Sequence, residues 1–402
     1  MKSFSDGQPM KSFSDAQPMK SFSDGQPMKV IIAGGGTGGH IYPAISIARA
    51  LQKNASHIKI IFVGTAQGLE SKIVPQAGYD LRLIQSGQLN FQGQIIQKIK
   101  SVRKLLIGLV QSVKLVLNEK PDFVIGVGGY ASAPVVLVAA MLSPFMKIQT
   151  AIWEPNAHPG LANRMLSWVV NKSYLVFNEA LIYLKSKNNL ILGMPLRPEI
   201  ENFKLSENKN EKFNLLCFGG SQGSMFLNDK LSDAVINNKN LFSQIKITHQ
   251  TGPRDFNRIK EKYSAEKLLS ENLEICEYIY DMPACYAKAD LLFCRGGAST
   301  LAEAAICGVV PVIVPLPAAD DHQQRNAEAL VNADSAFMIL QNNFDENKLI
   351  RILEQVINDK NLLLKMSERL GSVVSKGGAD RIAQDILLTI IKSQKNNNKE
   401  LS

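Results

Sequence analysis

The strongest constraint on the fold is a pattern that occurs twice in the 402 residues: a short apolar run that ends in glycines and precedes a segment of helical character. The first copy is Lys29–Ala33 before GGGTGG (34–39), and the second is Phe213–Phe218 before GGSQG (219–223). More apolar runs follow each copy: 58–63, 81–85, 122–127, 148–153 and 172–177 after the first, and 245–248, Leu273–Cys276, Leu291–Cys294 and 310–314 after the second. This alternation predicts an α/β chain with two doubly wound parallel sheets in tandem.

The composition agrees with two globular domains. Hydrophobic residues make up 45% and charged residues 20% of the chain, and one core rarely serves more than about 250–300 residues. The net charge of +9 favours anionic partners. The basic residues are not interleaved with aromatic residues, which argues against a nucleic-acid binder. Five cysteines without a Cys-x-x-Cys pair are typical of reduced thiols in a cytoplasmic protein.

Two polar segments lie outside the predicted sheets. Residues 1–27 are three copies of a nine-residue unit, MKSFSDGQP or MKSFSDAQP, which we expect to be disordered and which has no apolar run typical of a secretory signal. Residues 199–212 are polar and charged, which indicates a linker between the two domains.

The first glycine loop matches G-x-G-x-x-G, yet two observations argue against a dinucleotide site. Such a site needs an acidic residue about 20 positions further on, whereas the first acid after this loop is Glu70. A phosphate-binding P-loop fails as well, because His40 rather than Lys follows Gly39. Two interpretations remain: a loop whose N–H groups and following helix bind an anion, or a tight turn without a ligand. Similar loops at 219–223 and 295–300 favour the first interpretation.

His40 directly follows the first glycine loop, so we expect it at the ligand site. An imidazole there can take a proton from an attacking hydroxyl, since its pKa lies near neutrality. A role in binding only, or in structure only, stays open. His57, His158 and His249 have no comparable setting, and Asp320, Asp321 and His322 are expected to shape a turn. No group of residues has metal-ligand spacing.

Eight segments together resemble the MurG family of glycosyltransferases, which acts at the cytoplasmic face in peptidoglycan synthesis. They are GGGTGGHIYPAISIA (34–48), GVGGYASAP (126–134), EPNAHPGLANR (154–164), GMPLR (193–197), GGSQGS (219–224), YIYDM (278–282), CRGGASTLAE (294–303) and PLPAADDHQQRNA (315–327). The resemblance implies a GT-B fold, in which two Rossmann-like domains face each other across a cleft. The expected parts are a first domain at 28–198, the linker at 199–212, a nucleotide-sugar domain at 213–376, a helix at 377–392 that crosses back, and a tail at 393–402.

The resemblance also implies the reaction. N-acetylglucosamine would pass from UDP-N-acetylglucosamine, with inversion, to the 4-hydroxyl of the muramyl sugar of undecaprenyl-pyrophosphoryl-MurNAc-pentapeptide. Neither a metal nor another cofactor is expected. The alternative is a non-catalytic protein that binds a nucleotide sugar.

The resemblance implies a role for each matching residue. His40 would be the base. Thr37, Gly38 and Gly39 would lie at the cleft, Asn156 would contact the donor, and Arg197 and Ser221 would face its diphosphate. Ile279 would contact the uracil through its backbone. The segment formed by Ala298, Ser299, Thr300, Leu301, Ala302 and Glu303 would cover the nucleotide, with Glu303 on the ribose, and Gln323 and Gln324 would hold the sugar hydroxyls.

The sequence departs from the family at one motif. Trp153-Glu154-Pro155-Asn156 stands where the family usually has His-Glu-Gln-Asn. The loss of that histidine strengthens the prediction that His40 is the base.

A basic amphipathic segment, 94–110, is the predicted contact with an anionic membrane surface. Its apolar residues recur near helical spacing, and Lys98, Lys100, Arg103 and Lys104 are interleaved with them. An ordinary core-facing helix with a solvated basic face is the alternative. No apolar run reaches the roughly 18 residues of a membrane-spanning helix, so we expect any membrane attachment to be peripheral. The resemblance implies that it is at the cytoplasmic face of the bacterial inner membrane.

Overall fold

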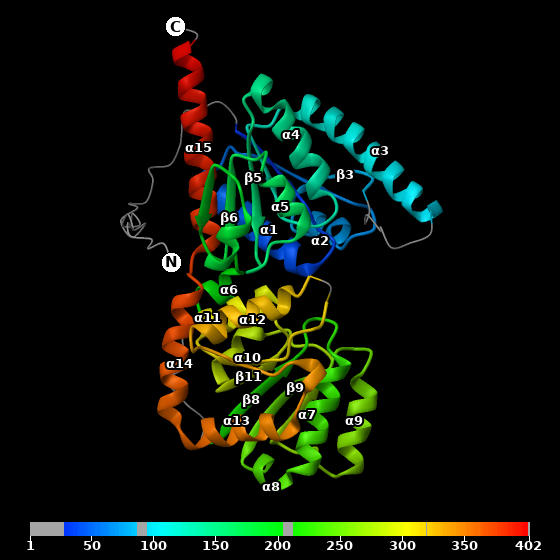
Figure 1. Ribbon diagram of the computed structural model, residues 1–402, viewed down its shortest axis with the longest axis vertical. Coiled ribbons are helices and arrows are strands. Elements are labelled where there is room, and N and C mark those ends of the chain that lie inside the picture. The colour runs from blue at the N-terminus through cyan, green and yellow to red at the C-terminus, as the bar shows by residue number, and fades with distance from the viewer. Residues whose placement is uncertain (1–27, 87–94, 204–211, 319, 401–402) are drawn as a thin grey trace, which may run out of the picture.

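A computed structural model describes residues 28–86, 95–203, 212–318 and 320–400 (Figure 1). Its two parallel sheets confirm the predicted pair of doubly wound domains, and its architecture is of the GT-B type. The first sheet has the order β3-β2-β1-β4-β5-β6-β7 and the second β10-β9-β8-β11-β12-β13.

The elements of the first domain alternate along the chain. They are β1 (Lys29–Ala33), α1 (Gly38–Asn54), β2 (Lys59–Gly64), α2 (Glu70–Gln76), β3 (Asp80–Leu83), α3 (Ile95–Glu119), β4 (Phe123–Gly126), α4 (Ser132–Met146), β5 (Gln149–Glu154), α5 (Leu161–Leu166), β6 (Lys172–Leu175), η2 (Asn178–Tyr183), β7 (Asn188–Ile191) and α6 (Pro198–Glu201).

The second domain repeats this arrangement, and the chain ends on a long helix. Its elements are β8 (Phe213–Phe218), α7 (Met225–Asn237), α8 (Lys239–Phe242), β9 (Ile245–Gln250), α9 (Phe256–Ala265), β10 (Leu273–Cys276), α10 (Met282–Lys288), β11 (Leu291–Cys294), α11 (Ala298–Cys307), β12 (Val310–Ile313), α12 (His322–Asn332), β13 (Phe337–Met338), η3 (Gln341–Asn343), α13 (Glu346–Asn358), α14 (Lys360–Val373) and α15 (Gly378–Glu400).

The apolar runs form strands because helices cover both faces of each sheet. In β1, Val30 and Ile32 pack into one hydrophobic cluster, and Ile31 and Ala33 pack into another on the opposite face. In each sheet the strand order reverses between two central strands, β1 and β4 in the first and β8 and β11 in the second. Ligands of such sheets bind beyond the carboxyl ends of the strands at this switch point. The glycine loops 34–39, 219–223 and 295–300 follow three of these four strands.

The chain passes between the domains twice, and the two crossings touch. A Cβ atom on Gly193 would lie 2.5 Å from the carbonyl oxygen of Ser375, and one on Gly378 would lie 2.4 Å from that of Met194. Glu201 accepts a hydrogen bond of 2.7 Å from the Gly377 N–H. Only glycine allows this close approach, so the crossings are interlocked at one point.

Helix α15 leaves this point and packs along α1 of the first domain (Figure 1). Asp385 on α15 accepts hydrogen bonds of 2.7 Å from both Lys172 Nζ and Tyr174 Oη of β6. The last helix of the chain therefore stabilises the first domain. In the part of the chain that the structure describes, no helix is long and apolar enough to cross a bilayer.

Candidate active site at the junction of the two domains

The front half of the first glycine loop serves packing. The Gly34 N–H bonds the Val63 carbonyl at 2.9 Å, and the Gly35 N–H bonds the Gly128 carbonyl at 3.1 Å. Gly35 and Gly128 have φ values of +146° and +94°, and a Cβ atom on Gly129 would lie 2.3 Å from the Gly35 oxygen. The loops after β1 and β4 thus interlock, and these N–H groups are not free for a ligand.

A buried carboxylate holds the middle of the loop. Glu70, 2% exposed, accepts hydrogen bonds from the Gly36 N–H at 2.7 Å and from the Thr65 N–H and hydroxyl at 2.8 and 3.0 Å. Glu70, whose position argued against a dinucleotide site, is therefore the anchor of the glycine loop. The indication in the sequence for this anchoring role was that Glu70 is the first acidic residue after the loop.

We expect Glu70→Gln to lower the free energy of unfolding by about 1–3 kcal/mol, because the amide NH₂ would meet backbone donors that now bond a carboxylate. Urea denaturation measures the change. Glu266→Gln, which removes an exposed ion pair with Lys239, is the matched control and should cost about 1 kcal/mol or less. Equal effects of the two substitutions would contradict the anchoring role.

His40 stands in the first turn of α1, half-buried against the loop after β4. A Cβ atom on Gly128 would lie 2.8 Å from its Nε2, so the ring packs directly on that glycine. Its Nδ1 is 3.4 Å from Thr37 Oγ1. Burial lowers the pKa of His40, partly offset by a hydrogen bond to the Gly35 backbone and by the charge of Glu70. The imidazole is therefore neutral at physiological pH and able to accept a proton.

The first turns of α1 and α11 meet across the junction. A Cβ atom on Gly39 would lie 3.9 Å from Ser299 Oγ, and neither Thr37 nor Gly297, the residues before the two helices, caps its helix with a side chain. The free N–H groups and the positive dipole ends of two helices consequently point at one place. This is an arrangement that binds a phosphate or another anion.

A chain of amides joins the domains next to this place. Glu154, buried at the end of β5, accepts hydrogen bonds from Asn156 Nδ2 at 3.0 Å and from Asn163 Nδ2 at 2.9 Å. Asn326 of α12, fully buried, donates to Asn156 Oδ1 at 3.1 Å and accepts from the Ala157 N–H at 2.8 Å. Burial raises the pKa of Glu154, partly offset by the hydrogen bonds that it accepts from Asn156, Asn163 and the Gly160 N–H. Asn156 is thus oriented from both domains. Asn326 lies within the segment 315–327, yet its contact with Asn156 is not predicted from the sequence.

Arg197 and Glu303 also meet across the junction. Arg197 Nη2 lies 3.5 Å from Glu303 Oε1, and the buried hydroxyl of Tyr286 lies 3.3 Å from Glu303 Oε2. Burial raises the pKa of Glu303, whereas Arg197 and Tyr286 lower it. The carboxylate is thereby held from two sides, and Tyr286 is a second contact that sequence reasoning missed.

The other predicted site residues differ in their exposure. Ser221 is exposed in the turn after β8, and Ser299 and Thr300 are half-buried, whereas Ala298, Leu301 and Ala302 are buried. The Ile279 N–H donates to Gln250 Oε1 at 3.4 Å. Gln323 Oε1 accepts from the Gly296 and Leu316 N–H groups at 3.1 and 3.0 Å. Gln324 Nε2 instead bonds Glu328 at 2.9 Å on the same helix, away from these contacts.

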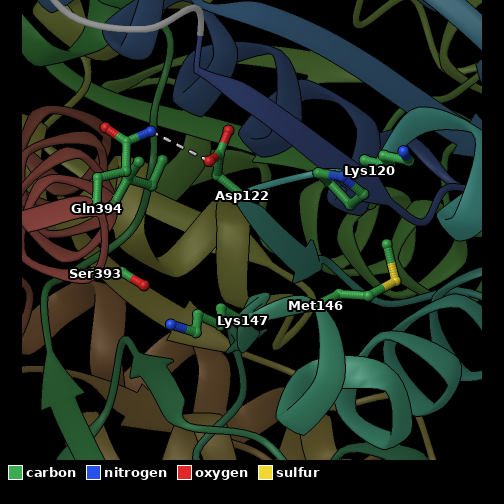
Figure 2. Close-up of a pocket in the computed structure, with 8 residues that line it drawn as sticks. Lys120, Asp122, Met146, Lys147, Ser393 and Gln394 are labelled. Carbon is green, nitrogen blue, oxygen red and sulfur yellow. Dashed lines mark hydrogen bonds between the residues drawn. The ribbon is translucent and has the colours of Figure 1, made fainter. Parts of the chain in front are cut away.

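A cavity of about 90 Å³ lies elsewhere, at the amino ends of β4 and β5 (Figure 2). Lys120, Asp122 and Lys147 line it together with Ser393 and Gln394 of α15, and Gln394 donates to Asp122 at 3.2 Å. It is at the opposite end of the sheet from the switch point and plays no part in this site. Among the described residues, no three His, Cys, Asp or Glu side chains form a group that could hold a metal ion.

Comparisons with known proteins agree with this geometry. Residues 30–175 match the glycosyltransferase family 28 N-terminal domain, and residues 214–385 match the C-terminal domain of that family. A relative from Bdellovibrio bacteriovorus is 49% identical over 89% of this chain and 98% of its own, and one from Myxococcus xanthus is 35% identical over 92% and 95%. Both are UDP-N-acetylglucosamine–N-acetylmuramyl-(pentapeptide) pyrophosphoryl-undecaprenol N-acetylglucosamine transferases.

Solved structures agree as well. Acinetobacter baumannii MurG superposes with a TM-score of 0.74 at 27% identity, covering 90% of this chain and 99% of its own. The calicheamicin glycosyltransferase CalG4, 15% identical with a TM-score of 0.67 over 91% of this chain and 99% of its own, shows the same fold. The two matched domains and the identity to these transferases place the chain in the MurG family of glycosyltransferase family 28.

Proposed function

We propose that this chain transfers N-acetylglucosamine from UDP-N-acetylglucosamine to the 4-hydroxyl of the muramyl sugar of undecaprenyl-pyrophosphoryl-MurNAc-pentapeptide, with inversion. One observation carries the proposal: the first turns of α1 and α11 meet, and these helices bear His40 and Glu303. A proton acceptor and a nucleotide-binding carboxylate thus belong to facing helices of two domains. The relatives named for this reaction cover about nine-tenths of the chain.

The donor would bind mainly to the second domain. Glu303 would accept hydrogen bonds from the two ribose hydroxyls, since an acidic residue binds the ribose hydroxyl in dinucleotide-binding folds. Arg197 would release part of its contact with Glu303 and neutralise the diphosphate, together with the N–H groups at the start of α11. Ser221 would face the same diphosphate, the Ile279 backbone the uracil, and Gln323 Nε2 the sugar hydroxyls.

The acceptor would bind to the first domain beside His40. Its 4-hydroxyl attacks the anomeric carbon, whose bond to the β-phosphate oxygen breaks, and the leaving UDP keeps the electron pair. The neutral imidazole of His40 takes the hydroxyl proton as the new glycosidic bond forms. Donors fixed at the diphosphate stabilise the charge that develops on the leaving group.

The competing function is binding of a nucleotide sugar without turnover. The experiment that separates them measures UDP release from UDP-N-acetylglucosamine with and without the lipid acceptor. We expect release only when the acceptor is present. Donor binding without release in the presence of acceptor would overturn the transferase and favour the binding protein.

We also propose that the protein attaches peripherally to the cytoplasmic face of the bacterial inner membrane. Gln94 lies outside the described residues, and only the backbone of 95–102 is described, so Lys98 and Lys100 are not placed. Arg103 and Lys104 are exposed on α3. Large exposed apolar side chains on three neighbouring helices support the proposal: Leu106, Val110, Val113 and Leu117 of α3, Met141 and Phe145 of α4, and Met165 of α5.

We expect replacement of Lys98, Lys100, Arg103 and Lys104 by Gln to weaken binding to anionic vesicles at least tenfold, since each basic residue near such a surface contributes about 1 kcal/mol. Turnover of a water-soluble acceptor should be largely kept. Vesicle sedimentation measures the binding. The control replaces four exposed lysines of the second domain, Lys246, Lys288, Lys360 and Lys365, and a loss of the same size there would contradict the proposed surface.

A further inference from the structure

Basic side chains from both domains gather at the start of α12. Asn326 accepts the Ala157 N–H at 2.8 Å, which brings the loop after β5 against α12 and places His158 beside it. His322 lies four residues before Asn326, one helical turn away. Arg164 on α5, the helix that follows the loop with His158, and Arg325 on the first turn of α12 complete the group.

The proximity of these groups has an electrostatic consequence. Burial lowers the pKa of His158, the charges of Arg164, Arg325 and His322 lower it further, and the charge of Asp320 partly opposes them. The ring also packs edge-on against Tyr183 at 4.6 Å between centroids. The sequence predicts no role for His158 and only a turn at His322.

Three buried nitrogen atoms of this group have no hydrogen-bond partner among the described residues. They are His158 Nδ1, Arg164 Nε and His322 Nδ1. Buried polar atoms are nearly always bonded, because an unsatisfied donor costs free energy. Arg164 Nε can only donate, and each imidazole Nδ1 donates in the tautomer that carries its proton there. These three atoms are therefore open to a ligand that offers hydrogen-bond acceptors.

Charged groups of both signs surround these nitrogen atoms. Glu328 is engaged by Arg325 at 2.9 Å, whereas Asp320 and Asp321 are exposed before α12 and leave Arg164 as the cation that is open to an anionic ligand. Within the described part of the chain, Arg164 has no acidic partner. Asp321, the residue before α12, has a φ of +47° and does not cap the helix, so its first N–H groups and its dipole add to the positive potential.

We propose that His158, Arg164, His322 and the first turn of α12 bind an oxyanion of the acceptor, a carboxylate or a phosphate group. The proposal rests on the transferase function above and concerns residues that the donor and the base do not use. The relatives' names describe an acceptor with both a pentapeptide and a pyrophosphate, so either could supply the oxyanion. Because the group includes residues of both domains, the acceptor would help to hold the domains together.

Kinetics of Arg164→Gln test the site. We expect the KM for the lipid acceptor to rise about tenfold or more, with kcat and the donor KM within about twofold. Arg49→Gln, at an exposed arginine of α1, is the matched control and should change none of the three constants. An unchanged acceptor KM in Arg164→Gln would overturn the proposal.

An acceptor whose peptide is replaced by an uncharged methylamide identifies the source of the oxyanion. If wild type and Arg164→Gln have equal KM values for this analogue, the site binds a peptide carboxylate. If the difference persists, the site binds the pyrophosphate. Either conclusion requires that Arg164→Gln has a higher KM than the wild type for the full acceptor.

A binding measurement on the wild-type chain does not depend on turnover. Titration with inorganic phosphate and with acetate should shift the imidazole NMR signals of His158 and His322. The signal of His249, buried between Tyr263 and Asn228, should stay in place. If the histidine signals shift but the protein transfers no sugar, the anion site stands and the transferase function is rejected. If the protein transfers sugar but neither anion shifts the signals, the anion site is rejected.

Discussion

Replacement of His40 by alanine is expected to lower kcat by about 10²–10⁴-fold, the usual contribution of a general base. The KM for UDP-N-acetylglucosamine should stay within a few-fold, because the imidazole acts on the acceptor hydroxyl rather than on the donor. Steady-state kinetics with donor varied at saturating acceptor measure both constants. His57→Ala, at an exposed histidine beyond the far end of α1, is the control and should change neither.

The pH dependence gives a second test of His40. Burial lowers its pKa below the ordinary value of 6.5, so the base loses activity only when the pH falls through that lowered value. We expect the acid limb of kcat/KM for the acceptor to lie below pH 6.5 and to vanish in His40→Ala. If His40→Ala mainly raises the donor KM, His40 binds the donor and another group is the base.

Replacement of Glu303 by alanine is expected to raise the donor KM at least tenfold and to lower kcat less. The carboxylate would contact the ribose in both the ground state and the transition state, and loss of such uniform binding appears in KM. Tyr286→Phe should raise the donor KM by a smaller factor, because Arg197 still holds the carboxylate. Glu354→Ala, at an exposed position of α13, is the control, and a loss of kcat at unchanged KM in Glu303→Ala would reverse the assigned role.

The charge of Glu303 adds a pH effect of known sign. Burial raises its pKa, and a protonated carboxyl accepts hydroxyl hydrogen bonds less well than a carboxylate. The donor KM should therefore rise as the pH falls through this raised pKa, and Glu303→Gln should remove the dependence. A donor KM that is independent of pH in the wild type would contradict this role of the Glu303 charge.

The fold was largely predictable because its strands are short apolar runs between glycines. β1, β8, β10 and β11 begin and end where the apolar pattern does. β7 and β13 were not predicted: they are edge strands with half-buried residues, and Asn188–Ile191 is half polar. Their pairing is decided by the neighbouring strand rather than by their own hydrophobicity.

The candidate site was predictable only in part, and for a physical reason. The glycine loops and His40 belong to a local pattern that can be read along the chain. The partners of Glu70 and Asn326 lie 34 and 170 positions away, and no periodicity in the sequence relates them. Such contacts arise only when loops distant in sequence fold against each other, within the first domain for Glu70 and between the domains for Asn326.

The interlocked crossings at Gly193 and Gly378 define how the two halves of the molecule can move. Since both connections touch at one point, we expect the halves to move by rotation about that point rather than by sliding. A substitution at Gly193 or Gly378 would then change how the two halves meet, and it would alter the handling of both substrates without touching either.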